Sequence, residues 1–220
     1  VKGKTDAGRR REERAGRTRQ RIVEAAIGLF LDRGYVVTTV AAIAREAGVA
    51  SATVYQAWGT KQAILAQALD LAIAGDADPV AVLERDWVQA AREEPDPRQR
   101  LRLVIEHTTD IAARTAPIKN LMRDAVAVEP SVADLIRRDH ERRYTTQQAL
   151  VNVIVGRNAD AATQPRHAGV DTFFALVNSD TFNLLVGHLG WTRGEWREWL
   201  FRILSAELFP RDNNGRTALS

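Results

Sequence analysis

Residues 39–61 carry the most informative hydrophobic pattern in the chain. The apolar positions at their start recur every three or four residues, which is the period of one helix face. These positions are Val40, Ile43, Ala44 and Ala47. Thr39 stands directly before them as an N-cap, and Gly48 stands directly after them, where glycine ends a helix at little cost. The pattern therefore predicts a short helix with defined ends.

A second short helix is predicted after the turn at residues 49–50. Ser51 is its expected N-cap, and Val54 and Trp58 are its expected buried residues because they lie four positions apart. Small apolar residues on both sides of the turn allow the two helices to cross closely. The stretch is therefore predicted to form a helix-turn-helix.

The residue types in and around this stretch resemble the DNA-binding domain of the TetR family of transcriptional regulators. The resemblance covers about residues 18–65. Its residues are Gly34, Tyr35, Thr38, Thr39, Val40, Ile43, Ala44, Ala47, Gly48, Val49, Thr53, Val54, Tyr55, Trp58 and Lys61. Trp58 stands where the family commonly has Phe, and residues 59–60 replace a commoner Lys or Ser pair. The resemblance implies a homodimer that binds a palindromic double-stranded operator and is released by a small molecule.

The rest of the chain reads as helices separated by proline and glycine, without an alternating strand pattern. Predicted helices cover residues 18–33, 60–74, 79–93, 97–114, 117–129, 131–155, 170–188 and 193–209, with a polar loop at 156–169. We therefore expect an all-α fold. The expected parts are a disordered basic arm (1–17), a helix-turn-helix domain (18–62), a helical ligand-binding and dimerisation domain (63–210) and a tail (211–220).

Positive charge is concentrated at the start of the chain. The net charge of the whole chain is only +3, but residues 1–21 hold nine Lys or Arg against three acidic residues. A basic arm beside a helix-turn-helix favours contact with DNA phosphates or the minor groove. Arg17 and Arg19 are the candidates for this contact, which is compatible with an arm that is solvated and disordered in the free protein.

The predicted second helix of the motif has one face available for DNA. Val54 points inward, which leaves Ser51, Ala52, Thr53, Tyr55 and Gln56 on the outer side. Gln56 is the best candidate for reading a base, since its amide can pair with adenine through two hydrogen bonds. The resemblance implies backbone contacts by Thr39, Thr53, Tyr55 and Lys61. The alternative is that these residues only cap and solvate the helices.

Other classes of function find no support in the sequence. The chain has no cysteine, which excludes disulfides and thiolate chemistry. We find no catalytic motif and no metal-ligand spacing among its four histidines, so we expect no enzyme, no cofactor and no metal site. No apolar run approaches the ~20 residues of a membrane span. The start of the chain lacks a hydrophobic signal core, so a cytoplasmic protein is expected.

The C-terminal helices are larger than DNA binding requires, which favours a pocket for a small effector, apolar or aromatic in character. Candidate lining residues are His107, Thr108, Met122, Tyr144, Phe174 and Asn178. The apolar last two helices are candidates for a homodimer interface. Its proposed residues are Val177, Leu184, Trp199 and Ile203. The alternative for each of these residues is ordinary packing, and the alternative function is a sensing or interaction module without specific operator binding.

Overall fold

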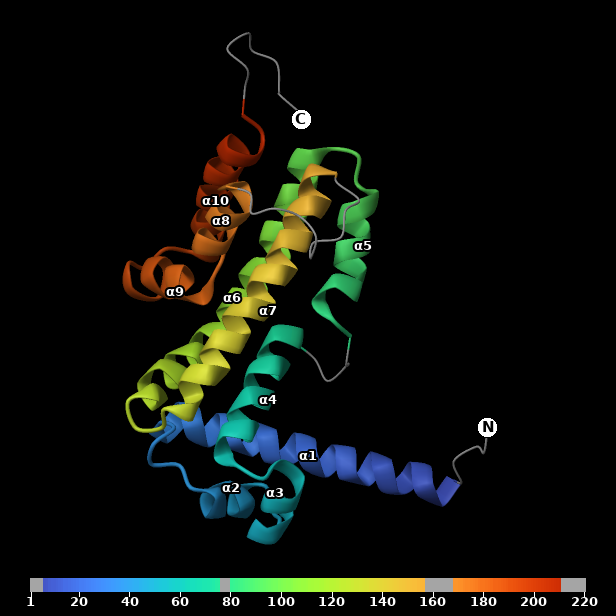
Figure 1. Ribbon diagram of the computed structural model, residues 1–220, viewed down its shortest axis with the longest axis vertical. Coiled ribbons are helices and arrows are strands. Elements are labelled where there is room, and N and C mark those ends of the chain that lie inside the picture. Colours follow the sequence, from blue (N-terminus) through green and yellow to red (C-terminus); the bar gives the residue numbers. More distant parts are fainter. Residues whose placement is uncertain (1–5, 76–79, 157–167, 211–220) are drawn as a thin grey trace. The chain divides into compact units, whose positions relative to one another are not determined.

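The computed structural model describes residues 6–75, 80–156 and 168–210, and helices are the only regular elements in these ranges (Figure 1). The predicted all-α fold is therefore confirmed. The helices are α1 Asp6–Arg33, α2 Val40–Glu46, α3 Ser51–Trp58, α4 Lys61–Ala74, the 3-10 helix η1 Val82–Glu84, α5 Asp86–Glu93, α6 Pro97–Val126, α7 Ser131–Val155, α8 Ala168–Leu176, α9 Ser179–Phe182, the π-helix η3 Asn183–His188 and α10 Arg193–Leu208. None of these helices is long and apolar enough to cross a membrane.

The described chain forms two compact units. The first joins the residues up to Leu71 with Pro117–Leu135, and the second joins Ala72–Ala116 with the residues from Ile136 onward. The turn between α6 and α7 therefore packs in one unit with α1, α2 and α3. The predicted functional domains, by contrast, follow the sequence without interruption.

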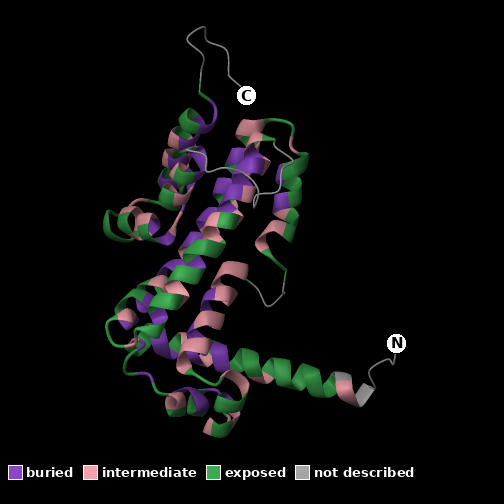
Figure 2. Cartoon of the chain, in the orientation of Figure 1, coloured by how far each residue is buried: buried purple, intermediate pink, exposed green. Residues whose placement is uncertain are grey.

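The core of the first unit is built from the apolar faces that the sequence pattern predicts. Buried residues come from all four of its first helices (Figure 2). They are Ile22, Val23, Ala26 and Phe30 of α1, Ile43 and Ala44 of α2, Val54 of α3, and Ile64, Leu65, Ala68 and Leu69 of α4. Burial of these side chains, worth about 1.5–3 kcal/mol for each large one, holds the short helices α2 and α3 in place.

The first helix begins well before its predicted start. α1 starts at Asp6, so the prediction of disorder is wrong for residues 6–17, whereas residues 1–5 lie outside the described part. The buried turns from Ile22 onward nucleate the helix, and each residue added to a nucleated helix costs little. Arginine, glutamate and alanine are good helix formers, which offsets the cost of Gly8 and Gly16.

The break predicted between Arg114 and Pro117 is absent, because α6 continues through Pro117 to its end. A proline inside a helix removes one backbone hydrogen bond, here the one that would end at the carbonyl of Ala113. Ala116 and Ile118 are both buried on either side of the proline. We infer that this packing outweighs the lost hydrogen bond.

Two other predicted helices are interrupted. The predicted helix at 170–188 breaks at Asn178, whose backbone is extended and whose side chain accepts hydrogen bonds from the backbone N–H groups of Asp180 and Thr181 at 2.8 and 2.9 Å. Asn178 thus starts a new helix instead of continuing the old one.

The predicted loop at 156–169 falls largely on residues 157–167, which lie outside the described part.

The predicted helix at 79–93 is replaced by the 3-10 turn η1 and the shorter α5. Arg85, with ψ of 146°, is extended between them. Asp86 occupies the first turn of α5, where a carboxylate interacts favourably with the helix dipole. Pro79, the predicted first residue, lies outside the described residues.

The second unit is built around α10, whose predicted bounds are confirmed to within one residue. Trp196, Leu200 and Leu204 are fully buried on one side of this helix. The ring of Phe182 meets Trp196 edge to face, with centroids 5.3 Å apart. Thr192 and Glu195 form a capping box that fixes the start of the helix, a motif worth about 1 kcal/mol.

Candidate nucleic-acid interface

α3 buries one face and presents the other to solvent, as the sequence predicts. Val54 is only 1% exposed, whereas Ala52, Tyr55 and Gln56 are exposed. Ser51 and Thr53 are half-buried at the margin. The five residues predicted to face DNA therefore lie on the outer side and edges of one helix.

Two local details of α3 differ from the prediction. The N-cap position belongs to Ala50, which offers no side-chain hydrogen bond, so Ser51 is the first helical residue instead of the cap. Trp58 is half-buried, not buried. Its indole nitrogen is itself shielded from solvent and has no hydrogen-bond partner among the described residues.

The turn between α2 and α3 depends on Gly48, whose φ is +64°. This left-handed conformation suits glycine and disfavours residues with a Cβ atom. The turn is closed by the backbone N–H of Val49, which donates to the carbonyl of Ala44 at 2.9 Å. Ala44 and Val54 are both buried beside it. The close approach of the two helices is therefore confirmed.

Thr39 caps α2 as predicted. Its hydroxyl oxygen accepts a hydrogen bond from the backbone N–H of Ala42 at 3.1 Å. The Thr39 side chain is exposed, and a hydroxyl that accepts one hydrogen bond can still donate its own proton. Capping and a phosphate contact are thus compatible at this residue.

Lys61 is held inside the first unit by two backbone carbonyls. Its ammonium donates to the carbonyl of Tyr35 at 2.9 Å and to that of Thr38 at 3.1 Å, and it lies 4.0 Å from the centroid of the Tyr35 ring. Burial lowers the pKa of Lys61, an effect that the charge of Glu129 opposes. An ammonium has three N–H donors, so at most one remains for a phosphate. The main role of Lys61 is therefore structural: its side chain connects the loop before α2 to the start of α4.

A contact with the turn between α6 and α7 completes this arrangement. The hydroxyl of Tyr35, which is 2% exposed, donates to the carboxylate of Glu129 at 2.6 Å. Burial, and then the hydrogen bond to Glu129 and its charge, raise the pKa of Tyr35. Nearby, the side-chain amide of Gln62 donates to the carbonyl of Ser131 at 2.6 Å. Two residues near the helix-turn-helix are thus tied to a turn far away in the sequence.

Sequence reasoning identified Tyr35 and Lys61 through the family motif but missed Glu129. Tyr35 and Glu129 are 94 positions apart, and a single acidic residue before a proline is typical of an ordinary turn. No local pattern could have pointed to its partner.

Arg17 and Arg19, the predicted contacts of the basic arm, are both exposed on α1. Residues two positions apart in a helix point about 200° away from each other. The two side chains therefore leave α1 on opposite sides, so one face of the helix presents only one of them.

The candidate pocket residues do not form one group. His107 lines a cavity of about 240 Å³ in the second unit, between the end of α4, η1, α5 and α6. Its ring stacks on that of Trp87, with centroids 4.8 Å apart. Burial lowers the pKa of His107, with Glu106 and Asp110 opposing the shift and Arg197 adding to it. Thr108, one position further along α6, is buried and donates to the carbonyl of Val104 at 2.6 Å.

Tyr144, Phe174 and Asn178 form a separate cluster in the second unit. The ring centroids of Tyr144 and Phe174 are 5.3 Å apart, and the guanidinium of Arg143 lies 3.8 Å from the centroid of Phe174. Burial lowers the pKa of Arg143, with Asp139 and Asp180 opposing the shift. The cluster accounts for these side chains as packing and capping. Met122 is buried in the first unit and belongs to neither group.

The four candidate interface residues differ in exposure. Val177 is 3% exposed and therefore offers no surface to a second chain. Leu184 is 54% exposed, whereas Trp199 and Ile203 are half-buried. Trp199 contacts Trp191 edge to face at 6.0 Å between centroids. Three of the four thus remain candidates for an interface.

The comparisons with known proteins agree with this geometry. The family model for the bacterial regulatory proteins of the tetR family matches residues 22–68, which comprise the C-terminal part of α1, all of α2 and α3, and the first half of α4. No curated protein sequence matches the chain.

Solved structures share the fold at low sequence identity. NalD of Pseudomonas aeruginosa, described as the secondary repressor of the MexAB-OprM multidrug efflux pump, is 18% identical with a TM-score of 0.58, over 87% of this chain and 95% of that one. FadR of Bacillus subtilis, in complex with stearoyl-CoA, is 18% identical with a TM-score of 0.58, over 84% and 96% of the two chains. A proposed transcriptional regulator of Saccharomonospora viridis, in complex with choline, is 22% identical with a TM-score of 0.57, over 85% and 95%.

At these identities the structural likeness concerns the fold, whereas the family model concerns the DNA-binding motif itself. The residues that the family model matches include the exposed face of α3 and the glycine turn before it. The match at residues 22–68, all of which lie in the first unit, identifies this region as similar to the bacterial regulatory proteins of the tetR family, and the chain as a whole shares the fold of solved transcriptional regulators.

Proposed function

We propose that the protein is a ligand-released repressor that binds a palindromic operator as a homodimer. The observation that supports this best is the exposed face of α3, formed by Ala52, Tyr55 and Gln56 and held by the buried Val54. A recognition helix has to present a few side chains on a rigid support. The short α3 meets this requirement because its inner side is anchored in the core.

Each side chain on this face has a role that its chemistry suits. Gln56 reads adenine with its amide, and Ala52 and the Thr53 methyl group contact thymine methyl groups. Ser51, Thr39 and Tyr55 donate hydroxyl protons to phosphates. Lys61 contributes through its position at the start of α4 and its one remaining N–H donor.

A homodimer follows from the small number of base pairs that one α3 can read. Two copies related by a two-fold axis place two recognition helices about 34 Å, or a multiple of it, apart on a palindrome. Leu184, Trp199 and Ile203 supply apolar surface for this contact in the proposal. Leu189, which is 63% exposed, extends it.

The effector site in this proposal is the cavity beside His107 and Trp87. The cavity volume is about 240 Å³, which is slightly below the ~300–1,000 Å³ of pockets for drug-sized ligands. The cavity therefore suits a ligand smaller than these. The stacked rings offer an aromatic wall, and Arg85, Asp110 and Arg114 add charged groups to the lining, which favours a flat ligand that carries polar groups. The ligands of the neighbours, stearoyl-CoA and choline, differ too much from each other to name one for this chain.

The DNA-binding part of the proposal is tested by a mobility-shift assay with the duplex upstream of the protein's own gene. We expect Gln56→Ala to weaken binding to this duplex by about 1–3 kcal/mol and to relax the preference at one base pair, without changing binding to random DNA. Gln89→Ala, an exposed glutamine on α5, is the matched control. Absence of retardation at low salt by the folded wild-type protein would refute the proposal and favour a sensing module without an operator.

The effector part is tested separately by adding a panel of small aromatic compounds, with and without polar groups, to the retarded complex. A compound that releases the wild-type protein but not the His107→Ala variant supports the cavity as its site. A compound that releases both equally places the effector site elsewhere.

A further inference from the structure

The first half of α1 has no packing role. Residues 10–17 are all exposed, whereas the second half of the helix buries Ile22, Val23 and Phe30 (Figure 2). Because the two halves form one continuous helix, the buried half fixes the direction of the exposed half relative to α2 and α3 in the same compact unit. The exposed half is therefore a rigid extension of the DNA-binding domain.

Four arginines line one side of this extension. Arg10, Arg14, Arg17 and Arg21 follow each other at intervals of four, three and four residues, which places them within a sector of about 60° around the helix axis. We call these four residues the arginine stripe. At a rise of 1.5 Å per residue, the stripe is about 17 Å long.

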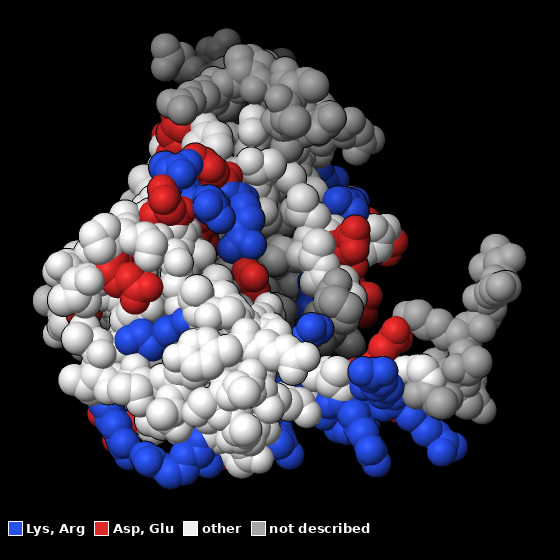
Figure 3. All heavy atoms as spheres, turned by 60° about the horizontal axis from the view of Figure 1, so that its bottom comes forward, with Lys and Arg blue, Asp and Glu red and all other residues white. Residues whose placement is uncertain are grey.

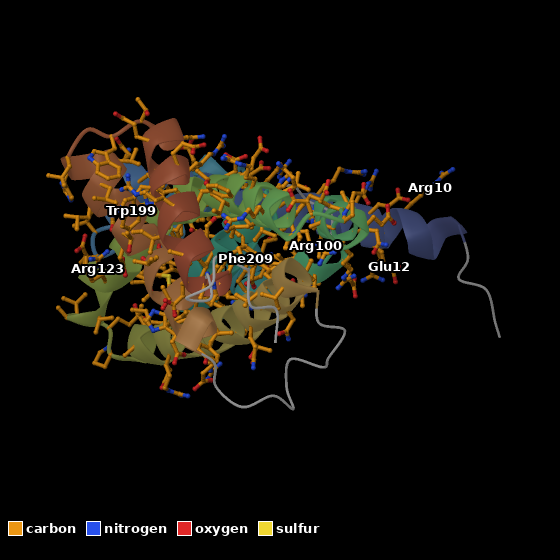
Figure 4. The ribbon with its side chains drawn as sticks, turned by 90° about the horizontal axis from the view of Figure 1, so that it is seen from above. Arg10, Glu12, Arg100, Arg123, Trp199 and Phe209 are labelled. Atoms are coloured by element: carbon orange, nitrogen blue, oxygen red, sulfur yellow. The ribbon has the colours of Figure 1, made fainter. Side chains whose placement is uncertain are left out.

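The figures agree with this arrangement. Figure 4 shows Arg10 and Glu12 pointing to opposite sides of α1. In Figure 3 the basic side chains of the extension project mainly from one edge, and an acidic side chain lies on the other. All four stripe residues are exposed.

The stripe is unfavourable for the isolated helix. Like charges three or four positions apart on a helix repel each other and destabilise it. Of the two acidic residues within 10–21, only Glu13 lies beside the stripe, three positions after Arg10 and four before Arg17, so the four arginines keep a net positive charge. A surface of this kind becomes favourable when it meets a dense array of negative charges.

We propose that the arginine stripe is a second DNA-contacting surface, which binds phosphates of the same duplex beyond the base pairs that α3 reads. The inference rests on the proposed DNA-binding function and adds the residues and the helix face that carry it. A duplex offers one negative charge per ~1.7 Å of its axis, so several phosphates lie within reach of a stripe about 17 Å long. The rigid connection to α3 allows both surfaces to meet one duplex without an ordering cost for a flexible arm.

The extension supplies its own matched control. Arg11 lies about 90° and Arg19 about 180° from the middle of the stripe, and both are exposed. The variants Arg14→Gln/Arg17→Gln and Arg11→Gln/Arg19→Gln remove the same charge from the same helix. Glutamine and arginine have similar helix propensities, and circular dichroism verifies that both variants keep α1.

The experiment measures binding to a labelled duplex of random sequence and to the duplex upstream of the protein's own gene, by fluorescence anisotropy between 50 and 200 mM KCl. For Arg14→Gln/Arg17→Gln we expect the slope of log K against log salt to fall by about two per protomer, and the affinity at 0.1 M salt to fall on the order of tenfold per arginine. For Arg11→Gln/Arg19→Gln we expect a slope within experimental error of wild type.

The possible results separate this inference from the proposed function. If the wild type binds both duplexes and the two variants lose affinity equally, the charge acts without a preferred face and the stripe proposal is wrong, while the repressor proposal stands. If the wild type binds neither duplex at low salt, the proposed function fails first. Hydrogen exchange gives a second readout, since DNA should slow exchange in residues 10–20 of the wild type more than in Arg14→Gln/Arg17→Gln.

Discussion

The hydrogen bond between Tyr35 and Glu129 should contribute to the free energy of unfolding of the first unit, which contains the helix-turn-helix. The substitution Tyr35→Phe tests this contribution. The change removes one hydroxyl from a side chain that is 2% exposed and leaves the aromatic packing against Phe30, at 5.2 Å between centroids. Hydrogen bonds to charged acceptors contribute about 1.5–3 kcal/mol. Because Glu129 is half-buried and regains some hydration, we expect a loss of about 1.5 kcal/mol in the free energy of unfolding of the first unit.

The assay has to report on the first unit alone, since the two compact units can unfold separately. Native-state hydrogen exchange of amides in α2 and in the part of α4 up to Leu71 provides this, because these residues belong to the first unit. A double-mutant cycle with Glu129→Gln separates the contact from the effects of each substitution alone. We expect a coupling free energy of about 1 kcal/mol. A coupling below about 0.3 kcal/mol would refute the idea that this contact stabilises the domain.

The pH dependence of stability gives an independent check on the same contact. The pKa of Tyr35 is raised in the folded state by burial and by Glu129, so above the unfolded value of about 10 the folded state holds a proton that the unfolded state has lost. The contribution of Tyr35 to stability is therefore complete below pH ~10 and declines as the pH rises further. Tyr35→Phe should remove this alkaline decline, and a decline of equal slope in both proteins would contradict the assignment.

Two further predictions concern the turn of the motif and the cavity. Gly48→Ala should cost about 1 kcal/mol in the free energy of unfolding, because its φ is +64° while the space around its Cβ position is open, and a residue with a Cβ is strained in this conformation. Gly28→Ala, in the interior of α1 and equally unobstructed, should instead stabilise by up to ~1 kcal/mol, so chemical denaturation of both variants distinguishes backbone strain from crowding; equal changes would argue against strain. Trp87→Ala should raise the pKa of His107 towards its ordinary value of about 6.5, because the stacked indole contributes to the burial that lowers it. An NMR titration of the His107 ring measures this shift, and the same lowered pKa predicts that the contribution of His107 to stability is full above pH ~6.5 and declines as the pH falls through the folded pKa.

The sequence by itself determined the local geometry of the DNA-binding motif. Thr39 and Gly48 set the ends of α2, and the spacing of apolar residues assigned Val54 to the core and Gln56 to the surface. These features depend on interactions between residues at most four positions apart, and such interactions are visible as periodicity and caps. The same information correctly placed the start of α4 and the bounds of α7.

Only the tertiary structure decided the features that depend on distant residues or on the balance of competing terms. The contact of Tyr35 with Glu129 joins residues 94 positions apart, and no local pattern records it. The sequence predicts that Pro117 breaks a helix, but the packing of its neighbours keeps α6 continuous. The sequence also predicts that Asn178 lies inside a helix, but its side chain caps the start of a new one. The basic start of the chain reads as a disordered arm, but the buried half of α1 nucleates it into a helix. The charge of the arginines was present in the composition, whereas their alignment on one side exists only because the chain there is helical.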